Sequence, residues 1–233
     1  MLHPIYMLGI GPGDPELVTV KAVRLIKEAD IVYVPESNAS GRSVAESIIR
    51  PYVDKDKLHL SYFPMTNDKA ELDRCYTALA EEIAGEQRAG KKVVYVTLGD
   101  SMLFSTAQYV STRLRKLGIE PLFVAGITSY VAAANIAGVS LADKAEDFVV
   151  MGIPDNINAL KKAYQEHNSV VFMKIHKRLD LLLQFVREVR PSVAVLVQRA
   201  SLPDEKVYNL LTGEHLPDNA GYLSICLLKK AIA

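Results

Sequence analysis

Apolar and polar positions alternate along this chain in two rhythms, one typical of strands and one of helices. Short apolar runs predict buried strands at residues 5–11, 30–35, 57–63, 92–100 and 119–126. Apolar side chains repeating every three or four residues predict helices at residues 19–29, 41–52, 68–88 and 101–118. Strands separated by helices pair in parallel through right-handed crossovers. The first half therefore predicts an α/β domain whose mainly parallel sheet carries helices on both faces.

The second half follows a different order of elements. Helices are expected at residues 129–138, 158–167 and 178–189, and strands at 146–154, 169–175 and 192–200. Two β-rich segments, 206–216 and 222–231, are separated by a turn without room for a crossover helix, so we expect antiparallel strands appended to a mixed sheet. We therefore predict two α/β domains, residues 1–120 and 121–233, with the active cleft between them, where ligand sites commonly lie.

Charge and composition limit the partners that the chain can attract. The apolar share is 49%, and 27 basic residues balance 27 acidic ones. A net charge of zero gives no overall field for nucleic acid or a membrane surface. The opening "MLHPIYMLGIG" has no basic leader, and its apolar run is shorter than the roughly 20 residues of a membrane span. We expect a cytoplasmic protein with neither kind of partner.

Cysteine and histidine spacing gives no sign of a disulfide framework or a metal site. Cys75 and Cys226 fall in different predicted elements, and Cys75 lies on the apolar stripe of its helix. The five histidines form no metal-binding pair of the H-x-x-x-H kind. We therefore expect free thiols and no protein-held metal.

The first glycine-rich turn, "MLGIGPGDPELVT", differs from a phosphate cradle. A dinucleotide fingerprint requires G-x-G-x-x-G, and Asp14 stands at the position of the third glycine. Pro12 removes a backbone N–H donor, and Asp14 and Glu16 would repel a pyrophosphate. The turn thus favours a ligand without phosphates, such as a cation. The alternative is a tight turn in which Asp14 caps a short helical turn at "PEL".

Three further stretches place small or polar residues at predicted strand ends. "VTLGDSMLFST" ends a buried strand at Gly99 and Asp100, a position where α/β sheets place ligands. "VAGITSYVAAANIAGVSL" has Gly126, Thr128 and Ser129 at the start of a small-residue helix. "VVFMKIHK" and "VLVQRASLPDEKV" continue past later strands. Each stretch alone is equally compatible with an ordinary loop.

Together, over nearly the whole chain, these stretches resemble the tetrapyrrole methylase family, S-adenosylmethionine-dependent enzymes that methylate precorrins and uroporphyrinogen. The N-terminal pattern G-x-G-P-G-D-P-E-L-x-T is specific to that family. "GDSMLFST", "VFMK" and "RASLPDE" look most like the branch that methylates C20 of precorrin-2 or cobalt-factor II. Ser101 replaces the usual proline of that branch, and Phe104 replaces an aromatic hydroxyl.

The resemblance implies a class III methyltransferase fold that binds S-adenosylmethionine in the trough between its two domains. It also implies a homodimer acting on a small-molecule tetrapyrrole. Carried over by motif, the donor-binding residues are Pro12, Gly99, Asp100, Met102, Leu103, Thr128, Ser129, Met173 and Ala200.

Residues for the chemistry are fewer. Asp100 is the candidate catalytic base, although it could equally cap the following helix, and His176 and Tyr109 are further candidates. The substrate's carboxylates require placed cations, and Arg suits bidentate binding. The candidates are Arg42, Lys174, His176, Lys177, Arg178 and Arg199, and a solvated basic turn remains the alternative for the run around residue 176.

Other functions stay open on the sequence. A sibling methylase could act at another ring position or on uroporphyrinogen III. A degenerate dinucleotide oxidoreductase would use Glu36 for the ribose, but its spacing is poor. A non-catalytic tetrapyrrole-binding protein could retain the same fold.

Overall fold

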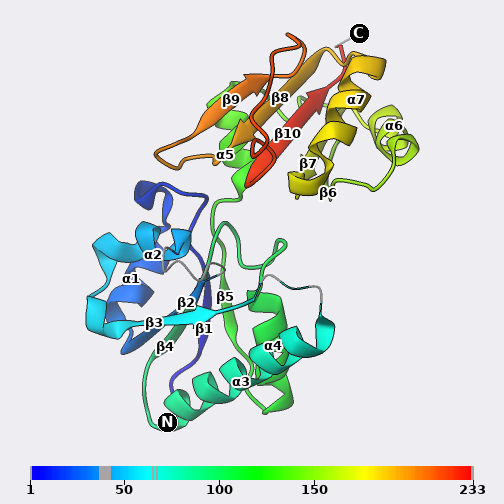
Figure 1. Ribbon diagram of the computed structural model, residues 1–233. Coiled ribbons are helices and arrows are strands. Elements are labelled where there is room, and N and C mark those ends of the chain that lie inside the picture. The colour runs from blue at the N-terminus through cyan, green and yellow to red at the C-terminus, as the bar shows by residue number, and fades with distance from the viewer. Residues whose placement is uncertain (1, 37–42, 65, 67, 232–233) are drawn as a thin grey trace. The chain divides into compact units, whose positions relative to one another are not determined.

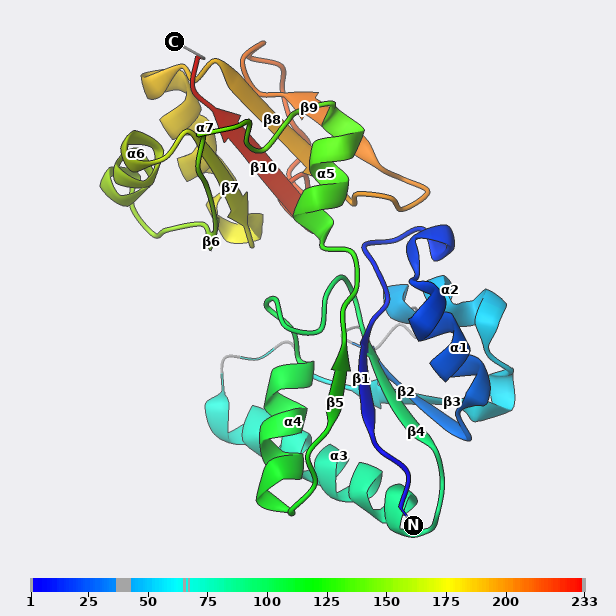
Figure 2. The ribbon, with the colours of Figure 1, turned by 180° about the vertical axis from the view of Figure 1, so that it is seen from behind.

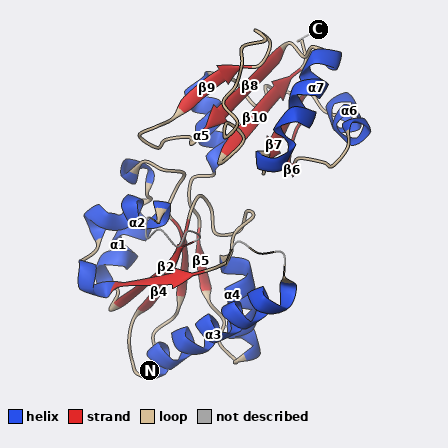
Figure 3. Ribbon diagram, viewed as in Figure 1, coloured by secondary structure: helices blue, strands red, loops and turns tan. Residues whose placement is uncertain are grey.

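The computed structural model describes residues 2–36, 43–64, 66 and 68–231, which form two compact units (Figure 1). The first unit is Met1–Thr128 and the second is Ser129–Ala233. Each unit contains its own sheet flanked by helices (Figure 3). Among the described residues, no helix combines the length and apolar character needed to cross a bilayer.

The first unit is a parallel sheet in the order β3-β2-β4-β1-β5. Its strands are β1 (Tyr6–Gly9), β2 (Ile31–Glu36), β3 (Leu58–Tyr62), β4 (Val93–Thr97) and β5 (Leu122–Val124). Its α-helices are α1 (Val20–Glu28), α2 (Val44–Ile49), α3 (Lys69–Arg88) and α4 (Ala107–Lys116). Short 3-10 helices occupy η1 (Pro15–Leu17), η2 (Arg50–Tyr52) and η3 (Lys55–Lys57). The predicted parallel α/β sheet is confirmed.

Alternating side chains bury both faces of this sheet. Leu8, Val34 and Val96 pack with α1 and α2, whereas their neighbours Met7, Tyr33 and Tyr95 pack with α3 and α4. Figure 2 shows these two pairs of helices on opposite sides of the sheet. Strand residues that point in turn to opposite faces explain why these strands read as continuous apolar runs. Helices on both faces leave the strand ends as the exposed edges where loops gather.

Helix starts follow side-chain caps. The Thr19 side chain accepts a hydrogen bond from the backbone N–H of Ala22, as its predicted N-cap role requires. Ala22, Leu25 and Ile26 form the buried stripe of α1. The helix expected from residue 101 is wrong at its start, because residues 101–104 form turns and bends and α4 begins at Ala107.

The boundary between the units differs from the expected division after residue 120. The units divide between Thr128 and Ser129, because β5 pairs with β1 in register Tyr6 to Leu122 through Leu8 to Val124. Residues 121–128 therefore belong to the first sheet and the loop that leaves it. The alternation of strands and helices places the strand at residues 119–126 in the first sheet, but it does not locate the end of the unit.

The second unit is a mixed sheet in the order β6-β7-β10-β8-β9. Its strands are β6 (Phe148–Gly152), β7 (Ser169–Met173), β8 (Val193–Gln198), β9 (Lys206–Asn209) and β10 (Ser224–Lys229). Its helices are α5 (Ser129–Ala137), α6 (Ile157–Glu166), η4 (His176–Arg178) and α7 (Leu179–Val189). α6 and α7 pack on one face, and α5 packs on the other.

The last strand lies in the middle of this sheet. β10 pairs antiparallel with both β7 and β8, while β6 and β7 pair in parallel. The mixed sheet is confirmed, but the expectation that both final segments are appended is wrong for β10, because only β9 lies at the edge. The antiparallel β10 between them leaves β7 and β8 running in the same direction, so their carboxyl ends meet at one edge.

Candidate functional site

Three strand ends of the first unit converge on three glycines. Gly9 ends β1, Gly99 follows β4, and Gly126 follows β5. A Cβ atom on Gly126 would lie 2.2 Å from the Gly99 carbonyl oxygen, and one on Gly9 would lie 2.6 Å from the Gly126 nitrogen. At Gly9 and Gly126 the main chains touch so closely that a Cβ atom does not fit, whereas Gly99 is set apart by its positive φ of 70°.

Backbone hydrogen bonds join the first turn to the loop after β4. The Gly99 N–H donates to the Gly11 carbonyl at 2.7 Å, and the Gly11 N–H donates to the Gly99 carbonyl at 3.1 Å. Gly11 has φ +80°, a conformation that L side chains rarely adopt. Pro12 and Gly13, which follow it, are both buried. This pairing fixes the first turn against the end of β4.

Asp14 of the first turn is the N-cap of the short helix that follows it. The Asp14 Oδ1 atom accepts a hydrogen bond from the Glu16 N–H at 2.8 Å and caps the short helix η1. The alternative interpretation of this turn, with Asp14 as a cap at "PEL", is confirmed. The Asp14 carboxylate is therefore used within the turn itself.

Asp100 links the loop after β4 to the end of β5. Its Oδ1 accepts from the Met102 N–H at 2.8 Å, and its Oδ2 accepts from the Gly126 N–H at 2.9 Å. Because both carboxylate oxygens bind main-chain donors, the geometry favours a positioning role for Asp100. The catalytic role expected for it stays a prediction.

Ser101 anchors the same loop from beneath. Its side chain is completely buried, and its Oγ donates to the Val124 carbonyl at 3.2 Å. The Gln108 side chain donates to the Ser101 carbonyl at 3.1 Å and thereby ties the loop to α4. A hydroxyl hydrogen bond thus holds the position at which the family resemblance leads us to expect a proline.

A buried polar ladder supports the loop. Ser105 Oγ donates to Thr97 Oγ1 at 3.0 Å, and the Tyr95 hydroxyl lies 2.8 Å from Thr106 Oγ1. Burial raises the pKa of Tyr95, so its phenol stays neutral in solution. Sequence reasoning missed this ladder, because a lone Tyr, Ser or Thr in a buried segment gives no signal of its partners.

The loop presents apolar side chains above these anchors. Met102 and Phe104 are 60% and 50% exposed, and Leu103 is half-buried. Phe104 has φ +49°, which is uncommon outside glycine and concentrates at functional loops. The first-unit residues predicted to bind the donor, Pro12, Gly99, Asp100, Met102, Leu103 and Thr128, are therefore gathered on the loops that follow β1, β4 and β5.

The second unit gathers its predicted donor residues at one sheet edge. Met173 ends β7, Ala200 follows β8, and both belong to the apolar cluster on the face that α5 covers. Ser129 begins α5 itself. Within this unit, the predicted residues thus share an edge and a face.

Backbone strain concentrates at that same edge. Lys174, Arg199, Ser201 and Leu223 all have positive φ, between 52° and 64°. The Arg199 N–H donates to the Leu223 carbonyl at 2.9 Å, which links the end of β8 to the start of β10. Non-glycine residues held in this conformation are typical of ligand sites. The one-letter sequence carries no sign of this strain.

The predicted substrate cations differ in their surroundings. Arg178 pairs with Asp155, and Arg199 donates to Asp204 at 2.6 Å, which lowers the pKa of Asp204. Both guanidinium groups thus already bind a carboxylate of the protein, the same chemical group that a substrate carboxylate would present.

The other candidates in this group lie on or beside η4. The His176 ring meets the Tyr222 ring edge-on, with centroids 5.7 Å apart. Lys174 is largely exposed, yet crowding by neighbouring atoms lowers its pKa through desolvation, and Lys177 is exposed. Arg42 lies outside the described residues.

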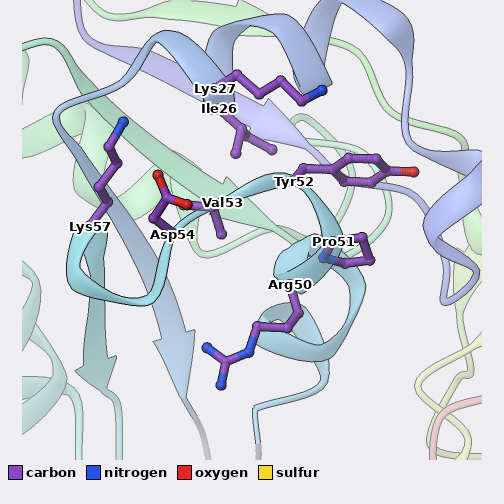
Figure 4. A pocket seen from close by; sticks show the side chains of 8 residues that line it. All are labelled: Ile26, Lys27, Arg50, Pro51, Tyr52, Val53, Asp54 and Lys57. Atoms are coloured by element: carbon purple, nitrogen blue, oxygen red, sulfur yellow. The ribbon is translucent and has the colours of Figure 1, made fainter.

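Two surface hollows lie elsewhere. One, in the first unit, has a volume of about 360 Å³ and is lined by Lys27, Arg50, Tyr52, Asp54 and Lys57 among others (Figure 4). The other, of about 510 Å³, lies beside α5 and includes Tyr130, Val131 and Phe148. Neither contains a residue that the sequence predicted for the site. No group of three potential metal ligands occurs in the part of the chain that the structure describes.

Comparison with known proteins gives a consistent result. A cobalt-precorrin-2 C(20)-methyltransferase of Salmonella typhimurium is 32% identical over 230 residues, covering 97% of this chain and 96% of that protein. A probable cobalt-precorrin-2 C(20)-methyltransferase of Methanocaldococcus jannaschii is 31% identical over 231 residues, covering 99% of this chain and 97% of that protein.

The fold comparison agrees. A crystal structure of uroporphyrin-III C-methyl transferase from Thermus thermophilus, complexed with S-adenyl homocysteine, matches with a TM-score of 0.65 at 25% identity. The match covers 97% of each chain. The family model of the tetrapyrrole (corrin/porphyrin) methylases matches residues 4–215. The chain therefore belongs to the tetrapyrrole methylase family, as its glycine turn and strand-end motifs predict.

Proposed function

We propose that this protein is an S-adenosylmethionine-dependent methyltransferase that methylates C20 of precorrin-2 or cobalt-factor II in cobalamin biosynthesis. The observation that carries the proposal is the nearly full-length similarity to two proteins named for the C20 reaction. A solved relative of the same fold, complexed with S-adenyl homocysteine, supports the choice of methyl donor.

The site in the first unit suits a cationic donor. The loops that carry the assigned residues offer main-chain groups of Gly11, Gly99 and Gly126 together with the apolar Met102 and Leu103 side chains. A Cβ on Gly99 would meet no atom within 4 Å, so open space lies beside this peptide. The described residues of the turn make no phosphate cradle, and a sulfonium cation needs none.

The residues we assign to donor binding follow the motifs. They are Pro12, Gly99, Asp100, Met102, Leu103 and Thr128 in the first unit and Ser129, Met173 and Ala200 in the second. In this assignment Asp100 acts by holding the Met102 and Gly126 peptides in place.

Methyl transfer requires the protein to align the substrate carbon with the donor more than to activate either group. The donor supplies an electrophilic methyl group on a positively charged sulfur, which becomes a neutral thioether after transfer. The chain's own residues align the nucleophilic carbon, exclude water and fix the loop that carries Met102. A rigid backbone site can perform these tasks without a catalytic triad.

Substrate carboxylates are assigned to cations of the second unit. Lys174, His176 and Lys177 lie in the segment after β7, and we propose that they bind acetate or propionate groups. Arg178 and Arg199 would do so by exchanging or sharing their present partners, Asp155 and Asp204. Arg42 completes the proposed set from the sequence alone.

Two measurements test the function. Calorimetry with S-adenosylhomocysteine tests the donor site without assuming a substrate, and we expect one site per chain. Incubation with methyl-labelled donor and either precorrin-2 or cobalt-factor II should then transfer one methyl group, which NMR of the product places at C20. A methyl group found at another ring position, or transferred only to uroporphyrinogen III, would assign the protein to a sibling activity.

Absence of transfer to every tetrapyrrole, despite tight tetrapyrrole binding, would instead identify a carrier. A dinucleotide enzyme would bind NAD tightly and leave S-adenosylhomocysteine unbound. These outcomes separate the proposed function from each alternative.

We also propose a homodimer in the cytoplasm. Family resemblance supports the dimer, and the free cysteines Cys75 and Cys226 suit a reducing compartment. Sedimentation equilibrium should give twice the chain mass of 25.7 kDa. A monomer at micromolar concentration would contradict the dimer, and fractionation of cells tests the compartment.

A further inference from the structure

Glu36 ends β2 with a buried oxygen atom that has no partner. Its Oε1 is shielded from solvent and accepts no hydrogen bond from any described residue. Leaving such an acceptor unpaired costs on the order of 1–3 kcal/mol. An unpaired buried carboxylate oxygen in a native protein therefore requires an explanation, and a ligand that supplies the donor is one.

The side chain lies on the same face of the sheet as the first glycine turn. Side chains alternate along a strand, so Glu36 follows Val32 and Val34 on the face that α1 and α2 cover. Ile10 and Val18, which flank the first turn, belong to the same apolar cluster. Glu36 is thus the last of the β2 side chains on the face where the residues flanking the first glycine turn are packed.

β2 is no longer paired with its neighbour β4 where it reaches Glu36. Its pairing with β4 runs from Ile31–Val93 to Tyr33–Tyr95 and then ends, although β4 continues to Thr97. β2 stays paired with β3 as far as Glu36–Tyr62. Glu36 therefore lies at the carboxyl edge of the sheet, beside the strand that leads into Gly99 and Asp100.

Two other described carboxylates of this edge, Asp14 and Asp100, have hydrogen-bond partners. Asp14 accepts from the Glu16 N–H, and Asp100 uses both oxygens for main-chain donors. Ser61 also has an unpaired buried hydroxyl, but it pairs with Pro35 in register and so points to the opposite face from Glu36. Among the described carboxylates, the Glu36 oxygen is the one both buried and unpaired.

We propose that Glu36 is the base that removes the proton from the methylated carbon, an inference that rests on the proposed function. In the first step, the carbon–methyl bond forms as the sulfur–methyl bond breaks. In the second, the C–H bond of that same carbon breaks, Glu36 Oε1 takes the proton, and the electron pair returns to the ring system. A carboxylate oxygen that is shielded from solvent and has no competing donor suits this task.

The test compares Glu36→Gln with the wild-type enzyme in a single turnover. The amide keeps the size of the side chain but is not a base. We expect the rate of final product formation to fall about 100-fold or more, the range of general-base catalysis. Affinity for S-adenosylhomocysteine and the thermal midpoint should stay at wild-type values.

Two further readouts separate a base from a structural residue. With deuterium on the reacting carbon, the variant should show a larger kinetic isotope effect than the wild type, because proton removal becomes limiting. Glu36→Asp, which retains a base on a shorter side chain, should recover part of the rate. Glu46→Gln is the matched control, since Glu46 is a nearby carboxylate on α2 that pairs with Arg50, and it should react at close to the wild-type rate.

Three results would overturn the proposal. Wild-type rates in Glu36→Gln, with wild-type protein active, would overturn this inference alone. Loss of donor affinity or of the folded state in both Glu36 variants would show a binding or structural role instead. A wild-type protein that binds S-adenosylhomocysteine but methylates no tetrapyrrole would overturn the proposed function, and this inference with it.

Discussion

Gly126 is the residue whose substitution should damage the first unit most. Gly126→Ala would place a Cβ 2.2 Å from the Gly99 carbonyl oxygen, a clash that no side-chain rotation relieves. We expect a loss of about 3 kcal/mol or more in the free energy of unfolding, together with loss of S-adenosylhomocysteine binding. Urea denaturation and calorimetry measure the two effects.

Gly85→Ala provides the matched control. Gly85 lies inside α3, and an added Cβ would meet no atom within 4 Å. Because alanine is the better helix former, this variant should gain about 1 kcal/mol. Equal behaviour of the two variants would contradict the steric account of the glycine crossing.

Asp100 allows a second test at this scale. Asp100→Asn leaves one oxygen for two main-chain donors, so either the Met102 or the Gly126 N–H loses its partner. We expect affinity for S-adenosylhomocysteine to fall about tenfold, consistent with one lost charge-assisted hydrogen bond. If instead kcat fell more than about 100-fold at unchanged affinity, Asp100 would be the base.

Single residues were predictable where the cause is local. Asp14 and Thr19 cap the elements that follow them, as their positions before short helical segments indicate. The Glu36 oxygen and the positive φ of Arg199 were not predictable, because both depend on atoms distant in the sequence.

At the scale of elements, an ion pair fastens a loop to the central strand of the second sheet. Lys229 of β10 donates to Glu146 at 2.7 Å and to the Ser140 carbonyl at 3.3 Å, with both charged side chains largely buried. The hydrogen bond from Lys229 lowers the pKa of Glu146. A carboxyl whose pKa is lower in the folded state stabilises the fold at pH values above its pKa in the unfolded state. This stabilisation is lost as the pH falls through its pKa in the folded state.

Lys229→Met should therefore unfold at a lower urea concentration than the wild type at pH 7. The difference should shrink as the pH falls from about 4.3, the usual value of a glutamate carboxyl, through the lower pKa that Glu146 has in the folded wild type. Urea midpoints measured between pH 3 and 7 check this, and a difference independent of pH would contradict the role of the pair.

Helices and strands with a strong apolar periodicity were predicted well. The prediction failed where a loop has apolar residues at helical spacing. The strand through Val93–Thr97 and helix α3 match their apolar patterns. Residues 101–105 have a helix-like pattern, yet Asp100 and Ser101 bind the end of β5 and hold them in a loop. Tertiary hydrogen bonds of this kind override local preference, and a single sequence does not reveal them.

At the scale of the molecule, each unit has what a domain needs to fold. The second unit carries an apolar cluster on each face of its sheet, one under α6 and α7 and one under α5. We expect residues 129–233, expressed alone, to show a cooperative urea transition and a circular dichroism spectrum of a mixed α/β fold. A gradual, non-cooperative transition would contradict this expectation.

The two-unit α/β architecture followed from the order of elements, whereas strand order did not. Periodicity identifies a strand but not its neighbours, so the central place of β10 and the position of β5 beside β1 required the structure. Within each unit the candidate residues lie on loops at one sheet edge, because loops after parallel strands meet there, and their role in binding stays a prediction.

The position of β10 has a consequence for synthesis. β7 and β8 reach each other only through β10, which leaves the ribosome after every other described strand. Until β10 has been translated, β7 and β8 lack the strand that lies between them in the folded sheet. A stop codon before residue 224 would thus remove the middle of this sheet rather than a dispensable tail.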